Sequence, residues 1–141
     1  MVYFKELMWK TAENSKEIGS LGEKIASEYL KEKGYKILDR NYSPRFISGP
    51  LRGEIDIIAE KEKTISFIEV KTLKDNLAQG FSPEQKVDLE KQKKIIKTAE
   101  SWLMEKKIPL DSRQQIDVIS VEINSQSKKA KIRHFQNAVF L

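Results

Sequence analysis

The chain of 141 residues has no cysteine and only one histidine, His134. It can therefore form neither a disulfide nor a thiolate metal site, and a histidine-based zinc centre or Ser-His-Asp triad has almost nothing to build on. Glycine and proline are scarce, at six and four residues, and no glycine-rich phosphate loop of the Walker or dinucleotide type is present. His134 and Asp117 lie in apolar strand-like segments, where structural roles are predicted for both.

A long apolar run is also missing. No stretch could span a bilayer, and Lys5, Glu6 and Lys10 interrupt the N-terminal segment where a signal peptide needs a continuous apolar region. We therefore expect a soluble cytoplasmic protein with no membrane partner. Lys and Arg outnumber Asp and Glu by 26 to 21, for a net charge of +5. This balance suits a polyanionic partner such as nucleic acid, although solubility explains it equally well.

The length and the hydrophobic periodicity predict one α/β domain over residues 1–141. The apolar N-terminal segment 1–13 is expected to form a short helix that covers the core or a partner subunit. Beyond it, the patterns predict helices and strands in the order αβββαββ, as a mixed central sheet flanked by helices needs. Their ranges are helix 15–33, strands 35–41, 53–60 and 64–72, helix 82–106, and strands 115–123 and 130–135.

The most informative feature is a pair of apolar strands that carry acids. Gly53-Glu54-Ile55-Asp56-Ile57-Ile58-Ala59 is followed, after a turn-like Glu60–Lys63, by Ile65-Ser66-Phe67-Ile68-Glu69-Val70-Lys71. Side chains two residues apart on a strand share a face, so Glu54 lies with Asp56 and Glu69 with Lys71. In a hairpin these groups converge, and clustered carboxylates suit a hard cation such as Mg²⁺ or Mn²⁺. The pattern is typical of a metal-dependent phosphodiesterase.

The Glu-x-Lys spacing is weak evidence when taken alone. It occurs three times, but Glu84/Lys86 and Glu105/Lys107 lie in helical sequence, where residues two apart point to different sides. Only Glu69/Lys71 follows an acid-bearing strand. The competing interpretation is a solvated ladder of salt bridges on the open face of a sheet, with Lys71 simply paired to Glu69 or Glu54.

Asp56, followed thirteen residues later by Glu69-Val70-Lys71, resembles the core of the PD-(D/E)xK nuclease superfamily. The wider pattern resembles a family of small bacterial predicted endonucleases related to archaeal-type Holliday-junction resolvases. The resemblance covers about residues 19–140. Its other matching segments are Gly22-Glu23, Ala26, Tyr29-Leu30, Gly34-Tyr35, Ile37-Leu38, Arg40-Asn41, Gly53-Glu54, Lys91-Gln92-Lys93-Lys94-Ile95, Ala99, Leu103, Asp117-Val118-Ile119 and Asn137-Ala138.

This resemblance implies a three-layer restriction-endonuclease-like core, DNA as the partner and a Mg²⁺ or Mn²⁺ cofactor. It implies that the peptide carbonyl of Val70 completes the metal sphere and that a helix-borne Glu, here Glu23, reaches the site. Symmetric cutting of branched DNA by a homodimer also follows from it. Two departures concern substrate contacts: a longer connection at residues 42–52, and Leu73 where a basic residue commonly follows the lysine.

The remaining candidates are less specific. Glu23 flanks the apolar face of its helix and could equally be an exposed charge, and Glu54 could orient Arg52 or a water in the second shell of the site. Lys86, Lys93 and Lys97 recur on one side of the second helix, as phosphate contacts or as a solvated face. In the long loop, Arg45 and Arg52 could contact nucleic acid.

Phe46 lies in the same loop, where it could stack on a base or anchor the loop. Three functional classes are left: a metal-dependent endonuclease, a non-cleaving nucleic-acid-binding module, and an interaction protein. The retained acids favour the first.

Overall fold

The computed structural model describes residues 2–6, 14–75 and 89–138. Along the chain these residues form six strands, two α-helices and one short 3₁₀ helix. Their bounds are β1 Val2–Glu6, α1 Ser15–Glu32, β2 Lys36–Tyr42, η1 Gly49–Leu51, β3 Ile55–Lys61, β4 Thr64–Lys74, α2 Leu89–Glu105, β5 Gln114–Asn124 and β6 Lys129–Phe135.

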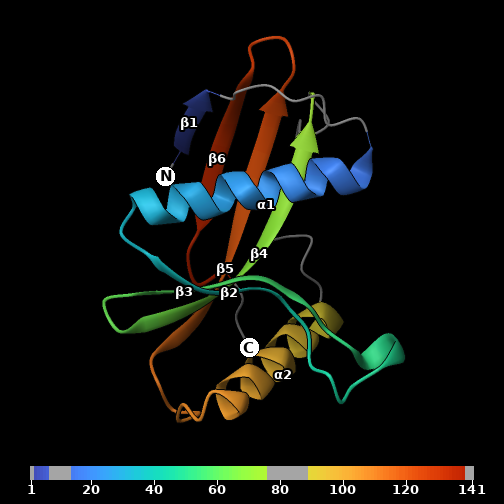
Figure 1. Ribbon diagram of the computed structural model, residues 1–141, viewed down its shortest axis with the longest axis vertical. Helices are drawn as coiled ribbons and strands as arrows, with labels where there is room; N and C mark the ends of the chain where they lie inside the picture. Colours follow the sequence, from blue (N-terminus) through green and yellow to red (C-terminus); the bar gives the residue numbers. More distant parts are fainter. Residues whose placement is uncertain (1, 7–13, 76–88, 139–141) are drawn as a thin grey trace.

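The six strands form one mixed sheet in the order β1-β6-β5-β4-β3-β2 (Figure 1). β4 and β5 are parallel, and every other neighbouring pair is antiparallel. A parallel pair needs a crossover connection, and the segment containing α2 supplies it between β4 and β5. The predicted order αβββαββ is therefore confirmed for the chain from α1 to β6.

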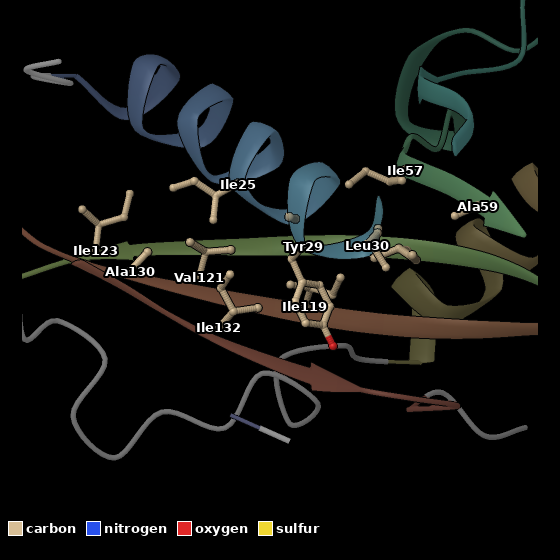
Figure 2. Packing of buried hydrophobic residues seen from close by; sticks show 12 residues of the cluster. Ile25, Tyr29, Leu30, Ile57, Ala59, Ile119, Val121, Ile123, Ala130 and Ile132 are labelled. Atoms are coloured by element: carbon tan, nitrogen blue, oxygen red, sulfur yellow. The ribbon is translucent and has the colours of Figure 1, made fainter. Parts of the chain in front are cut away.

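Helix α1 covers one face of this sheet. It begins after Asn14, whose side chain accepts a hydrogen bond of 2.9 Å from the Glu17 amide, and it ends before Gly34, which has a φ of +93°. Ile25, Tyr29 and Leu30 are buried against β5 and β6 residues such as Ile119 and Ile132 (Figure 2). This face forms the larger part of the core.

Helix α2 covers the opposite face. Ala99, Trp102 and Leu103 pack in a second cluster with Ile58 and Phe67, and the Phe67 and Trp102 rings meet edge to face at 5.9 Å. On β4, Phe67 belongs to this cluster, whereas its neighbour Ile68 belongs to the α1 cluster. Alternate residues of a strand point to opposite faces, so the sheet is the middle of three layers.

β3 and β4 form the predicted hairpin. Ile57 pairs with Ile68 and Lys61 with Thr64, which leaves Glu62 and Lys63 as the two turn residues. Both have positive φ, 51° and 65°, as the tight two-residue turns that match strand twist require. The hairpin brings the two acid-bearing segments together at its open end.

The prediction for the N-terminal segment was wrong. Val2–Glu6 is a strand, β1, that pairs antiparallel with β6, with Val2 opposite Arg133 and Glu6 opposite Lys129. Pairing with β6 satisfies backbone groups that would otherwise form an open sheet edge, and this outweighs a weak local helix preference. The rest of that segment, 7–13, and the predicted start of the second helix at Ser82-Pro83 lie outside the described residues.

Candidate functional site

The acids gather at the open end of the β3–β4 hairpin. The ladder pairs Ile57 with Ile68, so the same register places Asp56 opposite Glu69. Asp56 Oδ2 accepts a hydrogen bond of 2.8 Å from the backbone N–H of Val70. This bond holds the Asp56 carboxyl beside the Glu69-Val70-Lys71 segment, as the sequence spacing predicts.

Glu69 is the centre of the charge cluster. Its Oε1 accepts from Lys71 Nζ at 3.0 Å and also from Lys91 Nζ of α2. The Glu69 side chain is only 15% exposed, and its second oxygen, Oε2, is buried without a hydrogen-bond partner. A buried carboxylate oxygen with no partner is costly and rare, so Glu69 has an unused ligand position.

Helix α1 delivers the third acid, Glu23. A Cβ atom at the preceding Gly22 would lie 1.8 Å from Thr72 Oγ1, so only glycine lets α1 approach β4 this closely. The Glu23 carboxylate then reaches Asp56 and hydrogen bonds to it. Asn41 orients Glu23, because its Nδ2 donates to both carboxylate oxygens at 3.1 and 3.3 Å. Glu23 is thus half-buried and is held by Asn41 of β2.

A second close approach positions the start of β3. A Cβ at Gly53 would lie 2.2 Å from Thr98 Oγ1 and 3.1 Å from the Lys94 carbonyl oxygen, both on α2. Ser43 closes the long loop before it, since its hydroxyl donates to the Gly53 carbonyl at 2.8 Å and accepts from Arg52 Nε at 2.7 Å. Glycine at position 53 thus brings the loop, α2 and Asp56 together.

Burial and the neighbouring acids make Asp56 a weak acid. Desolvation is the main cause that raises the pKa of Asp56 to about 7; the Val70 hydrogen bond opposes it, and the charges of Glu23 and Glu69 add to it. Burial, together with the contact with Lys91, lowers the pKa of Lys71 despite the attraction of Glu69. Burial alone would lower the pKa of Lys91 as well, but its contact with Glu69 raises it on balance.

Two cavities meet at Asp56. One of about 390 Å³ is lined by Asp56, Glu69 and positive groups of the loop and α2, namely Arg52, Lys91 and Lys94. The other, of about 310 Å³, lies on the α1 side and is lined by Glu23, Asp56 and Val70 among others. Glu54 lines the first cavity, but it is exposed and precedes β3. Asp56 is accessible from both faces of the sheet.

The donor set suits a hard divalent cation. Glu23, Asp56 and Glu69 are oxygen ligands of the kind that Mg²⁺ and Mn²⁺ take, and Glu69 Oε2 is unpartnered. In the part of the chain that the structure describes, no group of three Asp, Glu, His or Cys side chains is arranged so that it could hold a metal ion. Two ammonium groups instead neutralise Glu69. The residue types suit such a cation, but their arrangement would have to change, and Glu69 would have to exchange its ammonium partners, before they could hold one.

The predicted nucleic-acid contacts divide into two groups. Arg52 lines the cavity with the acids, whereas Arg45, Lys93 and Lys97 are exposed away from it, and Lys86 lies outside the described residues. The Phe46 side chain is 94% exposed, so it does not anchor the loop.

Sequence reasoning assigned no role to Lys91 or Asn41, which contact Glu69 and Glu23. The spacing of Lys91 from buried Ile95, Thr98 and Trp102 is the signal that places it on the inner side of α2. No comparable local pattern marks Asn41.

A separate polar group lies on the α1 face. His134 Nε2 is bonded to Asp117 Oδ2 at 2.8 Å, and His134 Nδ1 to the Tyr29 hydroxyl at 3.1 Å. Asp117 Oδ1 accepts from Gln115 Nε2 and from the Asn137 amide, each at 2.9 Å. All three of Tyr29, Asp117 and His134 are buried. The predicted structural roles of His134 and Asp117 agree with this network.

Fold and site together define a three-layer α/β protein with an acid–lysine cluster at the end of its central hairpin. The chain belongs to the family described as "Uncharacterised protein family UPF0102", whose model matches residues 22–121. This range contains Glu23, Asp56, Glu69, Lys71 and Lys91. Neither α1 nor α2, the two α-helices of the described residues, is long and apolar enough to cross a membrane.

Similar chains cover nearly the whole protein. A UPF0102 protein of Alkaliphilus oremlandii is 42% identical over 125 residues, which is 88% of this chain and 98% of the relative. One from Clostridium botulinum strain Loch Maree is 40% identical over 127 residues, 88% and 94% of the two chains. UPF0102 protein TTE1452 of Caldanaerobacter subterraneus is 38% identical over 126 residues, 89% and 96%.

Proposed function

We propose that the protein is a divalent-metal-dependent endonuclease of the PD-(D/E)xK superfamily, which hydrolyses phosphodiester bonds of DNA. One observation carries the proposal: the buried, unpartnered Oε2 of Glu69 lies in a cluster with Asp56 and Lys71. A salt-bridge ladder needs no unpaired oxygen and no acid whose pKa is raised towards neutrality. A cation site accounts for both.

The acids would hold Mg²⁺ or Mn²⁺, with Asp56 and Glu69 as side-chain ligands and the Val70 carbonyl and Glu23 completing the set. When bound, the cation polarises the scissile phosphate and lowers the pKa of a water molecule. To hold it, Glu69 would exchange its ammonium partners for the cation, and Asp56 would be deprotonated. Asn41 keeps the Glu23 carboxylate turned towards Asp56.

The lysines have distinct tasks in this proposal. Lys71 lies beside Glu69, and its lowered pKa suits it to position the attacking water, to assist its deprotonation or to offset charge on the phosphate. Lys91 neutralises Glu69 in the metal-free site. If Glu69 held the cation instead, Lys91 would be available to contact the phosphate from the cavity that Arg52 and Lys94 also line.

The preference for DNA, for branched substrates and for a homodimer rests on the resemblance to the resolvase-related family. Arg45 and Phe46 are exposed in the same loop that ends at Arg52, and they offer a second contact surface outside the cavity. The described residues of one chain contain one such cluster, and symmetric cutting of two strands requires two.

The test is a cleavage assay. Purified protein is incubated with linear, single-stranded, flapped and four-way DNA in Mg²⁺, Mn²⁺ or EDTA, and Asp56→Asn serves as the matched control. We expect nicking of at least one substrate with a metal, and none with EDTA or the variant. If no substrate is cut but both proteins bind DNA equally tightly, the protein is instead a binding module on a nuclease-like fold.

A further inference from the structure

Three residues on neighbouring strands continue the cluster across the sheet. Lys71 of β4 pairs with Ser120 of β5, and Ser120 pairs with Arg133 of β6. Paired residues on adjacent strands project from the same face. Phe67 and Glu69 lie four and two residues before Lys71 on β4, so they share its face, and Phe67 packs against α2. Lys71, Ser120 and Arg133 therefore form one row on the α2 face.

This row contains buried polar atoms without partners. Ser120 Oγ and Arg133 Nε are buried and make no hydrogen bond, like Glu69 Oε2. Ser120 is 1% exposed. Within the described ranges, Glu69 Oε2, Ser120 Oγ and Arg133 Nε all lie on this face of β4, β5 and β6. Such atoms are rare in native proteins because each loses its hydration without replacement.

The chemistry of the unpartnered donors selects the ligand. Arg133 remains charged at any physiological pH, and its guanidinium suits the planar, bidentate contact that phosphate oxygens offer. A serine hydroxyl can donate to the same oxygens. Lys131 and Glu122, opposite each other on β6 and β5, lie on the same face and offset one another's charge. Among the described residues of the row, Lys71 and Arg133 carry positive charge.

The spacing suits one extended strand of nucleic acid. Two strand spacings of a sheet, about 10 Å, separate the backbones at Lys71 and Arg133. Long lysine and arginine side chains cover part of that distance, so adjacent phosphates of one strand can contact both residues. Row and metal site share Lys71.

We propose that Arg133, together with Ser120, binds the phosphate next to the one that is cleaved, so that the substrate strand crosses β4, β5 and β6 on the α2 face. This subsite rests on the proposed nuclease function. It makes Arg133 and Ser120 binding residues that hold the strand in place, whereas Asp56, Glu69 and Lys71 act on the scissile phosphate.

The test compares Arg133→Gln with Arg113→Gln. Arg113 is exposed, immediately precedes β5 and lines a different cavity, so its substitution removes the same charge away from the row. Binding of a fluorescent single-stranded oligothymidylate is measured in EDTA over a range of salt concentrations. Arg133→Gln should weaken binding roughly tenfold and lower the salt slope by about 0.7, and Arg113→Gln should change affinity less than about twofold.

Arg133→Lys and Ser120→Ala guard against a folding defect. The lysine keeps the charge but loses the planar fork, so it should recover the salt slope but only part of the affinity. Ser120→Ala removes one unpartnered hydroxyl, and it should weaken binding without lowering the melting temperature. If Arg133→Gln does not fold, the binding measurements on Arg133→Lys and Ser120→Ala test the subsite instead.

Wild-type affinity and salt slope in Arg133→Gln would overturn the subsite, as would equal losses in Arg113→Gln. If either result is obtained and the wild-type protein still cleaves DNA with Mn²⁺, the subsite proposal is rejected but the nuclease proposal is not. A wild-type protein that neither binds nor cleaves any DNA overturns both proposals.

Discussion

Two buried polar clusters lie on the same sheet, and they differ in whether their carboxylate oxygens have hydrogen-bond partners. In the cluster of Asp117, His134 and Tyr29, both carboxylate oxygens and both ring nitrogens have partners. In the cluster of Asp56 and Glu69, one carboxylate oxygen has none, and burial with two neighbouring acids raises the pKa of Asp56 to about 7.

The difference separates a structural network from a ligand site. A buried polar network stabilises only when every member is satisfied, and the Asp117 cluster meets that condition within the chain. In the Asp56 cluster, two lysines contact one oxygen of Glu69, Oε1, whereas its other oxygen has no partner. No group of the described residues reaches Glu69 Oε2, which is why a cation is proposed.

The largest expected effect is on catalysis. Asp56→Asn and Glu69→Gln keep the shapes of the side chains but remove the charges that hold the cation, so each should lower cleavage by about 10³-fold or more. Asp117→Asn should retain most of the activity at temperatures where it is folded. Cleavage rates in Mn²⁺, measured well below each melting temperature, check this; equal losses in all three variants would erase the distinction between the clusters.

Stability should show the reverse pattern. Asp117→Ala leaves His134 Nε2, Gln115 Nε2 and the Asn137 amide without their Asp117 partner, and should lower the free energy of unfolding by about 3 kcal/mol. Urea unfolding in EDTA measures it, with Asp111→Ala, an exposed acid, as the control. A loss below about 1 kcal/mol would mean that the network contributes little to the fold.

Metal binding should stabilise one cluster only. At a free Mn²⁺ concentration of 100 times Kd, mass action adds about 2.7 kcal/mol, a rise on the order of 10 °C in Tm. Asp56→Asn combined with Glu69→Gln should abolish the rise, and Asp117→Asn should keep it. Thermal scans with Mn²⁺ and EDTA decide this, and an equal response in the double variant would remove the site assignment.

The pH dependence of stability should differ as well. The folded pKa of Asp56, about 7, lies above the ordinary value of 3.8, so between these pH values the folded protein holds a proton that the unfolded chain has lost. In EDTA the stability of the wild type should therefore fall as pH rises from about 4 to 7 and then level off, by roughly 2 kcal/mol relative to Asp56→Asn.

Saturating Mn²⁺ should reverse this trend, because the metal competes with the proton. Urea titrations of both proteins at several pH values test it. Parallel pH profiles in EDTA would show that Asp56 ionises normally.

The smallest effect concerns the two sides of α2. Lys91 and Lys94 line the cavity, whereas Lys93 and Lys97 are exposed. Replacing Lys91 and Lys94 by Gln should weaken DNA binding about fivefold, and the same change at Lys93 and Lys97 should have less than half that effect. Anisotropy titrations in EDTA compare the pairs. A larger loss for Lys93 and Lys97 would restore the stripe predicted from spacing.

Local periodicity was enough to predict α1, the β3–β4 hairpin, and the meeting of Asp56 with Glu69 and Lys71. Each depends on spacing within a short segment: residues two apart on a strand share a face, and a hairpin places neighbouring strands in register. Glu23 was predicted partly from its position beside the apolar stripe of α1, because a helix packed on the sheet brings such a residue to the strand ends.

Other features depend on contacts between distant segments. The apolar segment at Val2–Glu6 carries no period that distinguishes strand from helix, and only the free edge of β6 made it a strand. The contact between Lys91 and Glu69 needs the crossing of α2 over the sheet, and the close approaches at Gly22 and Gly53 set that geometry.

By itself, the sequence determined which residue types could meet at the hairpin and the order of the elements from α1 to β6. Only the tertiary structure decided which of these groups found partners. The hydrogen bonds of the Asp117–His134–Tyr29 network form only when β5, β6 and α1 pack together. Likewise, Glu69 Oε2, Ser120 Oγ and Arg133 Nε lack partners because none of the neighbouring side chains in the fold reaches them. Partner contacts across a sheet are long-range, so no local pattern encodes them.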